Sequence, residues 1–196
     1  MLNFNNILPI IIGYFLGSIP SAYIIAKNRG VNITSKVKDG GLGTMGTVKT
    51  LGKFPGFLVG AMDFCKGGVS IMIAEKMSGE DWVMVLTGVA AIIGHNWSIF
   101  LHFLGGKGSA TTFGNLFYLL PEQFLLAGVV TAIPTCFLRK KSRVTLPGKK
   151  RNFRTSSFLT GILFLFTFFF ALIFGESYVI SFSPIIFSLP IMMKKN

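Results

Sequence analysis

The stretch GHNWSIFLHFLGGKGSATT, Gly94 to Thr112, decides how the rest of the chain is interpreted. It contains both histidines, His95 and His102, and it lies between apolar segments that are expected to be membrane helices. Polar groups at the end of a membrane helix are costly unless they meet water or a polar ligand. We therefore expect the chemistry of the protein in this stretch.

The Gly-Gly-Lys-Gly loop within this stretch suits an anion. Gly105, Gly106 and Gly108 allow close backbone approach, so that consecutive N–H groups can point at a phosphate. Lys107 adds a positive charge of the kind that binds phosphate. Loops with glycines and a lysine also occur without any ligand, so this motif alone leaves an ordinary loop as an equal alternative.

The composition is that of a polytopic membrane protein. Of the 196 residues, 51% are hydrophobic and only 13% are charged, whereas soluble domains average roughly 25% charged residues. The net charge of +12 comes from basic residues that fall in a few loops between apolar runs. This distribution argues against a nucleic-acid-binding surface, and residues 1–196 are expected to form a single polytopic membrane domain.

The apolar segments predict an all-α fold of about seven transmembrane helices, some of them short or broken. Their approximate bounds are 7–26, 54–77, 83–95, 109–120, 124–138, 157–174 and 179–193. Pro20 is expected to disturb the first helix, and the fourth is too short to cross alone at 1.5 Å per residue. With the N-terminus outside and the C-terminus in the cytoplasm, most lysines and arginines fall on the cytoplasmic side of the cell membrane.

A second glycine-rich segment precedes the second apolar run. It reads GGLGTMGT, residues 40–47, and its glycines Gly40 and Gly43 are followed by Lys49. It does not follow a strand, which argues against a dinucleotide-binding loop and leaves an anion-binding loop as the candidate. The predicted topology puts this segment and the Gly-Gly-Lys-Gly loop on the same cytoplasmic face, which favours an anionic substrate.

Polar residues inside the first two apolar segments can each have a structural or a functional role. Ser18 either bonds back to a carbonyl of its own helix or lines a cavity. Asp63 and Lys66 are three residues apart, so they share a helix face and can pair. This pair is expected to be a structural ion pair or a functional one. The two cysteines define no metal-binding spacing, so no metal is predicted.

Four motifs occur in an order that is typical of a known family. They are GSIPSAY (17–23), the glycine-rich loop leading into TLGK (50–53), Asp63-x-x-Lys66-Gly67, and GHNWSIFLHFLGGKGSAT (94–111). The chain resembles the bacterial integral-membrane glycerol-3-phosphate acyltransferases that use acyl phosphate as donor. The resemblance implies a seven-helix fold without metal or cofactor. It also implies transfer of a fatty acyl group to the 1-hydroxyl of glycerol 3-phosphate, which gives lysophosphatidic acid for phospholipid synthesis.

The same resemblance suggests roles for individual residues. Lys107 with the N–H groups of residues 105–108 would hold one phosphate, and Lys49 with the 40–46 loop would hold the other. His95 would accept the hydroxyl proton or orient Ser18 or a loop carbonyl, unless a substrate phosphate oxygen is the base. Asn96 and Ser157 are further expected substrate contacts. The partners are the two substrates and the lipid bilayer, with no nucleic acid, and no oligomer is predicted.

The sequence departs from the family pattern at several positions. In the second motif Asp39 replaces a serine, Gly41 and Gly46 replace asparagines, and Lys49 replaces an arginine. In the third motif Ser98 replaces a proline, and the C-terminal His-Arg-x-Asn signature is not recognisable. These changes favour, as one alternative, an impaired homologue that binds acyl phosphate or lipid. A small-anion transporter is a further alternative, suggested by the Asp63 and Lys66 pair and the broken helices.

Overall fold

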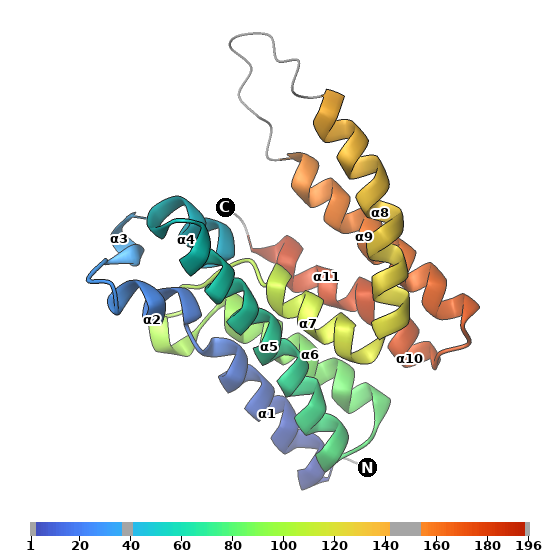
Figure 1. The fold of residues 1–196 in the computed structure, drawn as a ribbon. Coiled ribbons are helices and arrows are strands. Elements are labelled where there is room, and N and C mark those ends of the chain that lie inside the picture. The colour runs from blue at the N-terminus through green and yellow to red at the C-terminus, as the bar shows by residue number, and fades with distance from the viewer. Residues whose placement is uncertain (1–2, 37–40, 142–153, 195–196) are drawn as a thin grey trace.

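The computed structural model describes residues 3–36, 41–141 and 154–194, without the side chains of Lys36 and of residues 132–161. Over the described residues the chain is all helical and has no strand (Figure 1). The predicted site residue Gly40 and the side chain of Ser157 lie outside the described part.

The first apolar segment forms two helices where one disturbed helix was predicted. Helix α1 (Phe4–Ser18) ends just before Pro20, and α2 (Ser21–Lys27) begins just after it. Proline has no N–H for the helix and its ring crowds the preceding turn, so the chain changes direction here. The carbonyl of Ile19 at this break accepts hydrogen bonds from the backbone N–H of Ser21 at 3.0 Å and from Lys66 Nζ at 3.1 Å.

The polar segment after α2 forms short helices at one end of the bundle. Helix α3 (Ile33–Lys36) precedes α4 (Thr44–Leu51), which leads through Gly52 into the long helix α5 (Lys53–Met77). Gly52 has a φ of 98° and thus makes the sharp turn that separates α4 from α5. Helices α2, α3 and α4 gather at the end opposite the N-terminus (Figure 1).

The remaining helices follow the predicted apolar segments closely. They are α6 (Asp81–Asn96), the 3₁₀ turn η1 (Ile99–Leu101), α7 (Ser109–Leu119), α8 (Pro121–Lys141), α9 (Arg154–Ile173), α10 (Tyr178–Ser181) and α11 (Ser183–Met193). The last predicted helix is thus divided into α10 and α11. Helices α8 and α9 run side by side (Figure 1).

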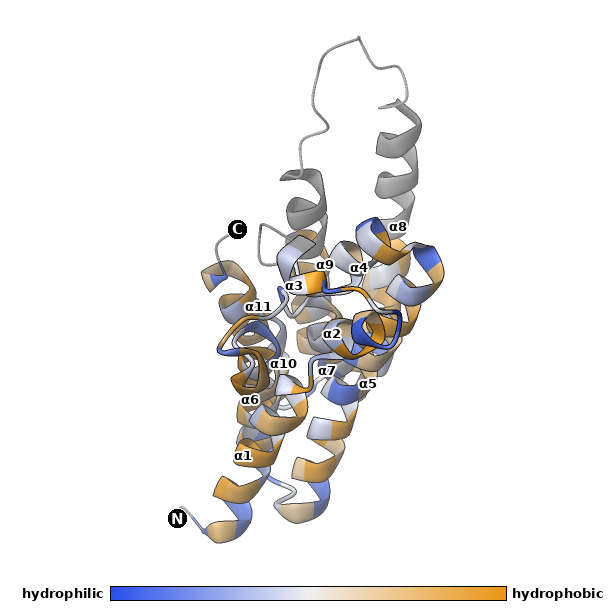
Figure 2. Cartoon of the chain, turned by 90° about the vertical axis from the view of Figure 1, so that its left-hand side faces the viewer, coloured by the Kyte–Doolittle hydropathy of each residue, from blue (hydrophilic) through white to orange (hydrophobic). Residues whose placement is uncertain are grey.

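Two stretches among the described residues are long and apolar enough to cross a membrane. They are Phe4–Lys27, which joins α1 and α2, and Lys53–Met77, which is α5. Ile162–Ile173 and Tyr178–Met193 are shorter apolar helices. Figure 2 shows apolar residues along α1 and α6 and polar residues gathered near α3 and α4.

Glycines permit the closest helix contacts. A Cβ added to Gly17 on α1 would lie 2.0 Å from the carbonyl oxygen of Ala91 on α6. A Cβ added to Gly114 on α7 would lie 1.9 Å from the carbonyl oxygen of Phe64 on α5. Small residues at such crossings let helix backbones approach closely, which is a common basis of helix packing in membranes.

We predict that Gly114→Ala destabilises the protein, because the new methyl group must push α7 away from α5. Overpacking of this kind costs about 1–3 kcal/mol, so the melting temperature in detergent should fall by several degrees. Gly128→Ala on α8 is the matched control, since a Cβ there meets nothing within 4 Å. Equal melting temperatures for the two variants would contradict the close α5–α7 packing.

Candidate active site

The two glycine-rich loops meet around the ring of His95. A Cβ added to Gly106 would lie 2.2 Å from His95 Nε2 and 3.0 Å from the carbonyl oxygen of Leu42. A Cβ added to Gly43 would lie 3.9 Å from both His95 Nε2 and the Cα of Gly106. The backbone N–H of Gly106 also donates to the carbonyl oxygen of His95 at 3.1 Å. The absence of a side chain at Gly106 therefore lets the His95 ring pack directly against the backbone of the loop.

Each loop leads into the N-terminus of a helix. Gly43 caps α4 and Gly108 caps α7, and neither cap residue has a side chain that could bond the first N–H groups of its helix. The first turn of a helix has unsatisfied N–H groups and the positive end of the helix dipole. Gly43 lies next to the His95 ring, and Gly106, which also meets the ring, lies two residues before Gly108, the cap residue of α7. Helix ends of this kind can stabilise a negatively charged group.

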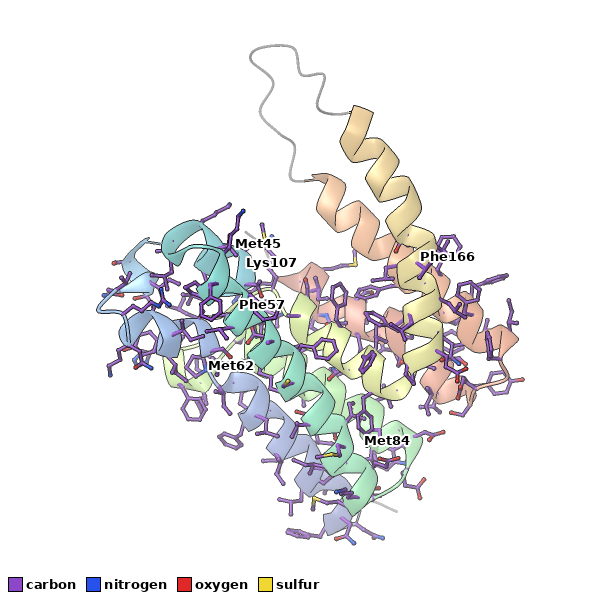
Figure 3. The ribbon with its side chains drawn as sticks, viewed as in Figure 1. Met45, Phe57, Met62, Met84, Lys107 and Phe166 are labelled. Carbon is purple, nitrogen blue, oxygen red and sulfur yellow. The ribbon has the colours of Figure 1, made fainter. Side chains whose placement is uncertain are left out.

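One lysine lies just before the start of α7 and the other in the last turn of α4. Figure 3 labels Lys107, which directly precedes Gly108, and the positive charge of Lys49 on α4 is close enough to act on Lys107. Partial burial, and then the charge of Lys49, lowers the pKa of Lys107 below its usual value. A phosphate between the two lysines would offset their mutual repulsion.

Asp63 lies at the centre of a buried polar cluster. Its Oδ1 lies 2.9 Å from Lys66 Nζ and 3.5 Å from His95 Nδ1, and it accepts a hydrogen bond from Ser21 Oγ at 2.9 Å. The four side chains are all buried. The pairing of Asp63 with Lys66 follows from their spacing, whereas the contact with His95 was not predicted, because 32 positions in sequence separate the two residues.

Ser18 is buried where α1 contacts α6. Its Oγ has no hydrogen-bond partner among the described residues, and its carbonyl oxygen accepts a hydrogen bond from Ser98 Oγ at 2.5 Å. Ser18, Ser21, Asp63, His95 and Gly105 help to line a cavity of about 10 Å³, which is room for about one water molecule. Ser18 thus lies beside the cluster, on the Nδ1 side of His95.

Asn96 joins α6 to the C-terminal helix. Its Nδ2 donates to the carbonyl oxygen of Pro190 on α11 at 2.8 Å, and a Cβ added to Gly108 would lie 2.7 Å from its Oδ1. Lys194, just after α11, donates to the carbonyl oxygen of Asn96 and lies 5.1 Å from the ring centroid of Trp97. The sequence analysis did not single out Lys194, because no spacing signal connects it with residues about a hundred positions earlier.

The structure brings most of the predicted site residues to one place. Gly43 and Gly106 lie next to Nε2 of His95, and Gly105 and Gly108 pack against His95 and Asn96. Lys49 is close enough to act on Lys107. Asp63 contacts Nδ1 of His95, and Ser18 lines the small cavity beside it. His102, which was not a predicted site residue, is exposed in the following turn and has a φ of 50°. Among the described residues no group of three or more His, Cys, Asp and Glu side chains is placed to hold a metal.

The arrangement has an electropositive side and a buried side. On the electropositive side, two helix ends and two lysines suit the phosphates of one or two substrates. On the buried side, a carboxylate contacts the other nitrogen of His95. The contacts among these buried groups tie the end of α6 to α2 and α5.

Comparison with known proteins identifies the family of the chain. The family model described as glycerol-3-phosphate acyltransferase matches residues 7–194. A glycerol-3-phosphate acyltransferase of Thermus thermophilus is 38% identical over 116 residues, which are 59% of this chain and 58% of the relative. Glycerol-3-phosphate acyltransferase 1 of Dehalococcoides mccartyi is 36% identical over 143 residues, which are 69% of this chain and 68% of the relative. The chain thus matches just under three fifths of the Thermus relative's length.

Two solved structures share the fold. One is the glycerol 3-phosphate form of PlsY (YgiH), an integral membrane glycerol 3-phosphate acyltransferase, with a TM-score of 0.75 and 30% identity. The other is its lysophosphatidic acid form, with a TM-score of 0.73. Both matches cover 96% of this chain and 87% of the crystallised chain. The chain belongs to the family of integral membrane glycerol-3-phosphate acyltransferases.

Proposed function

We propose that the protein transfers a fatty acyl group from acyl phosphate to the 1-hydroxyl of glycerol 3-phosphate, giving lysophosphatidic acid for phospholipid synthesis. The observation that supports this most is that the two glycine-rich loops approach each other at Gly43 and Gly106, with Lys49 close enough to act on Lys107. Both substrates contain a phosphate, so an enzyme that brings them together must offset the repulsion between two anions. Two separate positive helix ends meet this need.

Each loop would hold one phosphate. Lys107 and the N–H groups at the start of α7 bind the first, and Lys49 with the N–H groups at the start of α4 binds the second. The acyl phosphate is already activated, because phosphate is a good leaving group. The protein therefore acts mainly by placing the acceptor hydroxyl against the acyl carbon, while the fatty chain of the donor lies among the helices within the bilayer.

The topology that suits this reaction has seven crossings. Two pairs of described helices, α1 with α2 and α10 with α11, would each make one crossing. Each of five single helices would make one more: α5, α6, α7, α8 and α9. The N-terminus would be outside, and the basic end with α3 and α4 would face the cytoplasm of the cell membrane, where glycerol 3-phosphate is available. Asp81 and Glu176, at the other ends of their helices, would then face outward.

An impaired homologue that binds acyl phosphate or lipid is the second candidate. Lys49 favours the impaired homologue, because the family pattern has an arginine at this position. An arginine side chain can donate two parallel hydrogen bonds to a phosphate, whereas lysine provides a single point charge. Purified protein given palmitoyl phosphate and labelled glycerol 3-phosphate separates the two candidates. The enzyme forms labelled lysophosphatidic acid, whereas the impaired homologue binds palmitoyl phosphate and forms none.

We predict that Lys107→Ala lowers kcat/KM for glycerol 3-phosphate by about 10- to 100-fold, since hydrogen bonds to charged groups contribute about 1.5–3 kcal/mol. Lys76→Ala is the matched control, because Lys76 is an exposed lysine in the last turn of α5, away from the loops. The assay is formation of labelled lysophosphatidic acid. A rate for Lys107→Ala equal to that of Lys76→Ala would remove Lys107 from the phosphate site.

The pH dependence of substrate binding tests the pairing of the two lysines. Lys107 binds phosphate only when protonated, and its pKa is lowered, so the KM for glycerol 3-phosphate should rise as the pH increases through that pKa. The substrate phosphate stays fully ionised over this alkaline range, since its second pKa is about 6. In Lys49→Gln one cause of the lowering is removed, and the rise in KM should move to higher pH. An unchanged midpoint would show that Lys49 does not act on Lys107.

Cysteine labelling tests the orientation. In a background with Cys65→Ala and Cys136→Ala, we predict that Glu176→Cys reacts with a membrane-impermeant maleimide on intact cells. Met45→Cys on α4, where Met45 is 64% exposed, should react only after the membrane is opened. The opposite pattern would place the loops outside and would contradict a cytoplasmic active site.

A further inference from the structure

The Gly-Gly-Lys-Gly loop packs directly on the C-terminal end of α6. The backbone N–H of Gly106 donates to the carbonyl oxygen of His95 at 3.1 Å. A Cβ added to Gly105 would lie 2.1 Å from that oxygen and 2.6 Å from the carbonyl oxygen of Asn96. One added to Gly108 would lie 2.7 Å from Asn96 Oδ1. The position of this loop therefore depends on the position of the end of α6.

Two other helices fix the carbonyl groups at the end of α6. The last carbonyls of a helix receive no N–H group from a following turn, so other donors must bond them. The carbonyl of Asn96 accepts a hydrogen bond from Lys194 Nζ, just after α11, and the carbonyl of Trp97 accepts one from the hydroxyl of Tyr14 on α1 at 3.1 Å. Lys194 Nζ also lies 5.1 Å from the ring centroid of Trp97, where a cation is attracted to the ring.

Asn96 and the end of α11 cap each other. Asn96 Nδ2 donates to the carbonyl of Pro190 at 2.8 Å, and this carbonyl is one of the last four of α11. Lys194 follows α11 and donates to the carbonyl of Asn96, which is the last residue of α6. The C-terminal end of a helix carries partial negative charge, which a lysine offsets. Lys194 thus reduces the negative charge of two helix ends beside the loop.

From these contacts we infer that Asn96 and Lys194 are positioning residues, which together hold the Gly-Gly-Lys-Gly loop where Lys107 and the N–H groups at the start of α7 bind phosphate. The inference deepens the proposed function and rests on it. Asn96 has no exposed surface, so it acts through the backbone of the loop. Lys194 acts through Asn96, because its amino group is bonded to the carbonyl of that residue.

Two explanations compete with this inference. In the first, Lys194 binds a substrate phosphate directly. In the second, the contacts only stabilise the helix bundle as a whole. Lys194→Met removes the charge and keeps a long side chain, and Asn96→Leu removes the amide and keeps a similar size. Melting temperatures in detergent show whether these variants are folded. If neither folds, the contacts hold the whole bundle and the inference is wrong.

Hydrogen exchange examines the loop without any substrate. The amide of Gly106 reports on the contact, because its hydrogen bond to the His95 carbonyl breaks when the loop leaves α6. In Lys194→Met and in Asn96→Leu we expect the peptide that contains Gly106 to exchange about 10-fold faster, which is the usual effect of losing one hydrogen bond. Peptides from the middle of α5 should exchange as in the wild type. Unchanged exchange at Gly106, or an equal increase in α5, would overturn the inference.

The kinetics of lysophosphatidic acid formation separate positioning from direct contact. Each variant should raise the KM for glycerol 3-phosphate about 10-fold with a smaller change in kcat, and the double variant should raise KM less than about threefold more, since the two residues act as a unit. A rise in KM for Lys194→Met with none for Asn96→Leu would show that Lys194 contacts the substrate, and would overturn the inference.

Two further variants serve as controls in this assay. Lys194→Arg should keep KM within about threefold of the wild type, because arginine can donate to the same carbonyl and lie over the same ring. Lys76→Met should leave KM unchanged, since Lys76 is an exposed lysine in the last turn of α5. A loss in Lys194→Arg as large as that in Lys194→Met would contradict the capping role of Lys194.

The two measurements separate this inference from the proposed function. Faster exchange at Gly106 in both variants, in a protein that forms no lysophosphatidic acid, would support the positioning of the loop and count against acyl transfer alone. Acyl transfer together with unchanged exchange at Gly106 would overturn the positioning role and leave the proposed function in place.

Discussion

The buried carboxylate of Asp63 is the constraint on which the site depends. A charge in the interior of a helix bundle is tolerated only when it is paired and hydrogen-bonded. Asp63 meets this requirement with groups from three parts of the chain: Lys66 on its own helix, Ser21 after the break in the first segment, and His95 at the end of α6. The requirement to satisfy one carboxylate thereby fixes how α2, α5 and α6 meet.

The substrate side of the site is formed largely by backbone. An added Cβ at Gly106 would clash with His95 Nε2, and one at Gly105 would lie 2.1 Å from the carbonyl oxygen of His95. The ring and the carbonyl group of His95 already occupy the space that side chains would need at these two positions, so only glycine fits there. Glycines also leave backbone N–H groups uncovered, which the proposed phosphate sites would require. Lys49 and Lys107 add charge beside the loops, where solvent still reaches them.

Much of the fold could be predicted from the sequence because long apolar runs and prolines set the helix bounds. The short segment at 109–120 corresponds to α7, and the helix that Pro20 was expected to disturb is divided there into α1 and α2. The pairing of Asp63 with Lys66 follows from helical spacing alone. The contacts of His95 with Asp63 and of Lys194 with Asn96 could not be predicted, because they depend on how separate helices pack and no local pattern encodes that packing. Charge distribution suggested that both glycine-rich loops share one face, but it did not indicate that His95 lies between them.

The buried charges of the Asp63 cluster largely cancel one another. Asp63 and Lys66 together are neutral, so the cluster adds little net field to the face where the proposed phosphates would bind. Attraction of the substrates would then be left to the helix ends and to Lys49 and Lys107. A paired carboxylate can therefore hold α2, α5 and α6 together without weakening the positive potential at the loops.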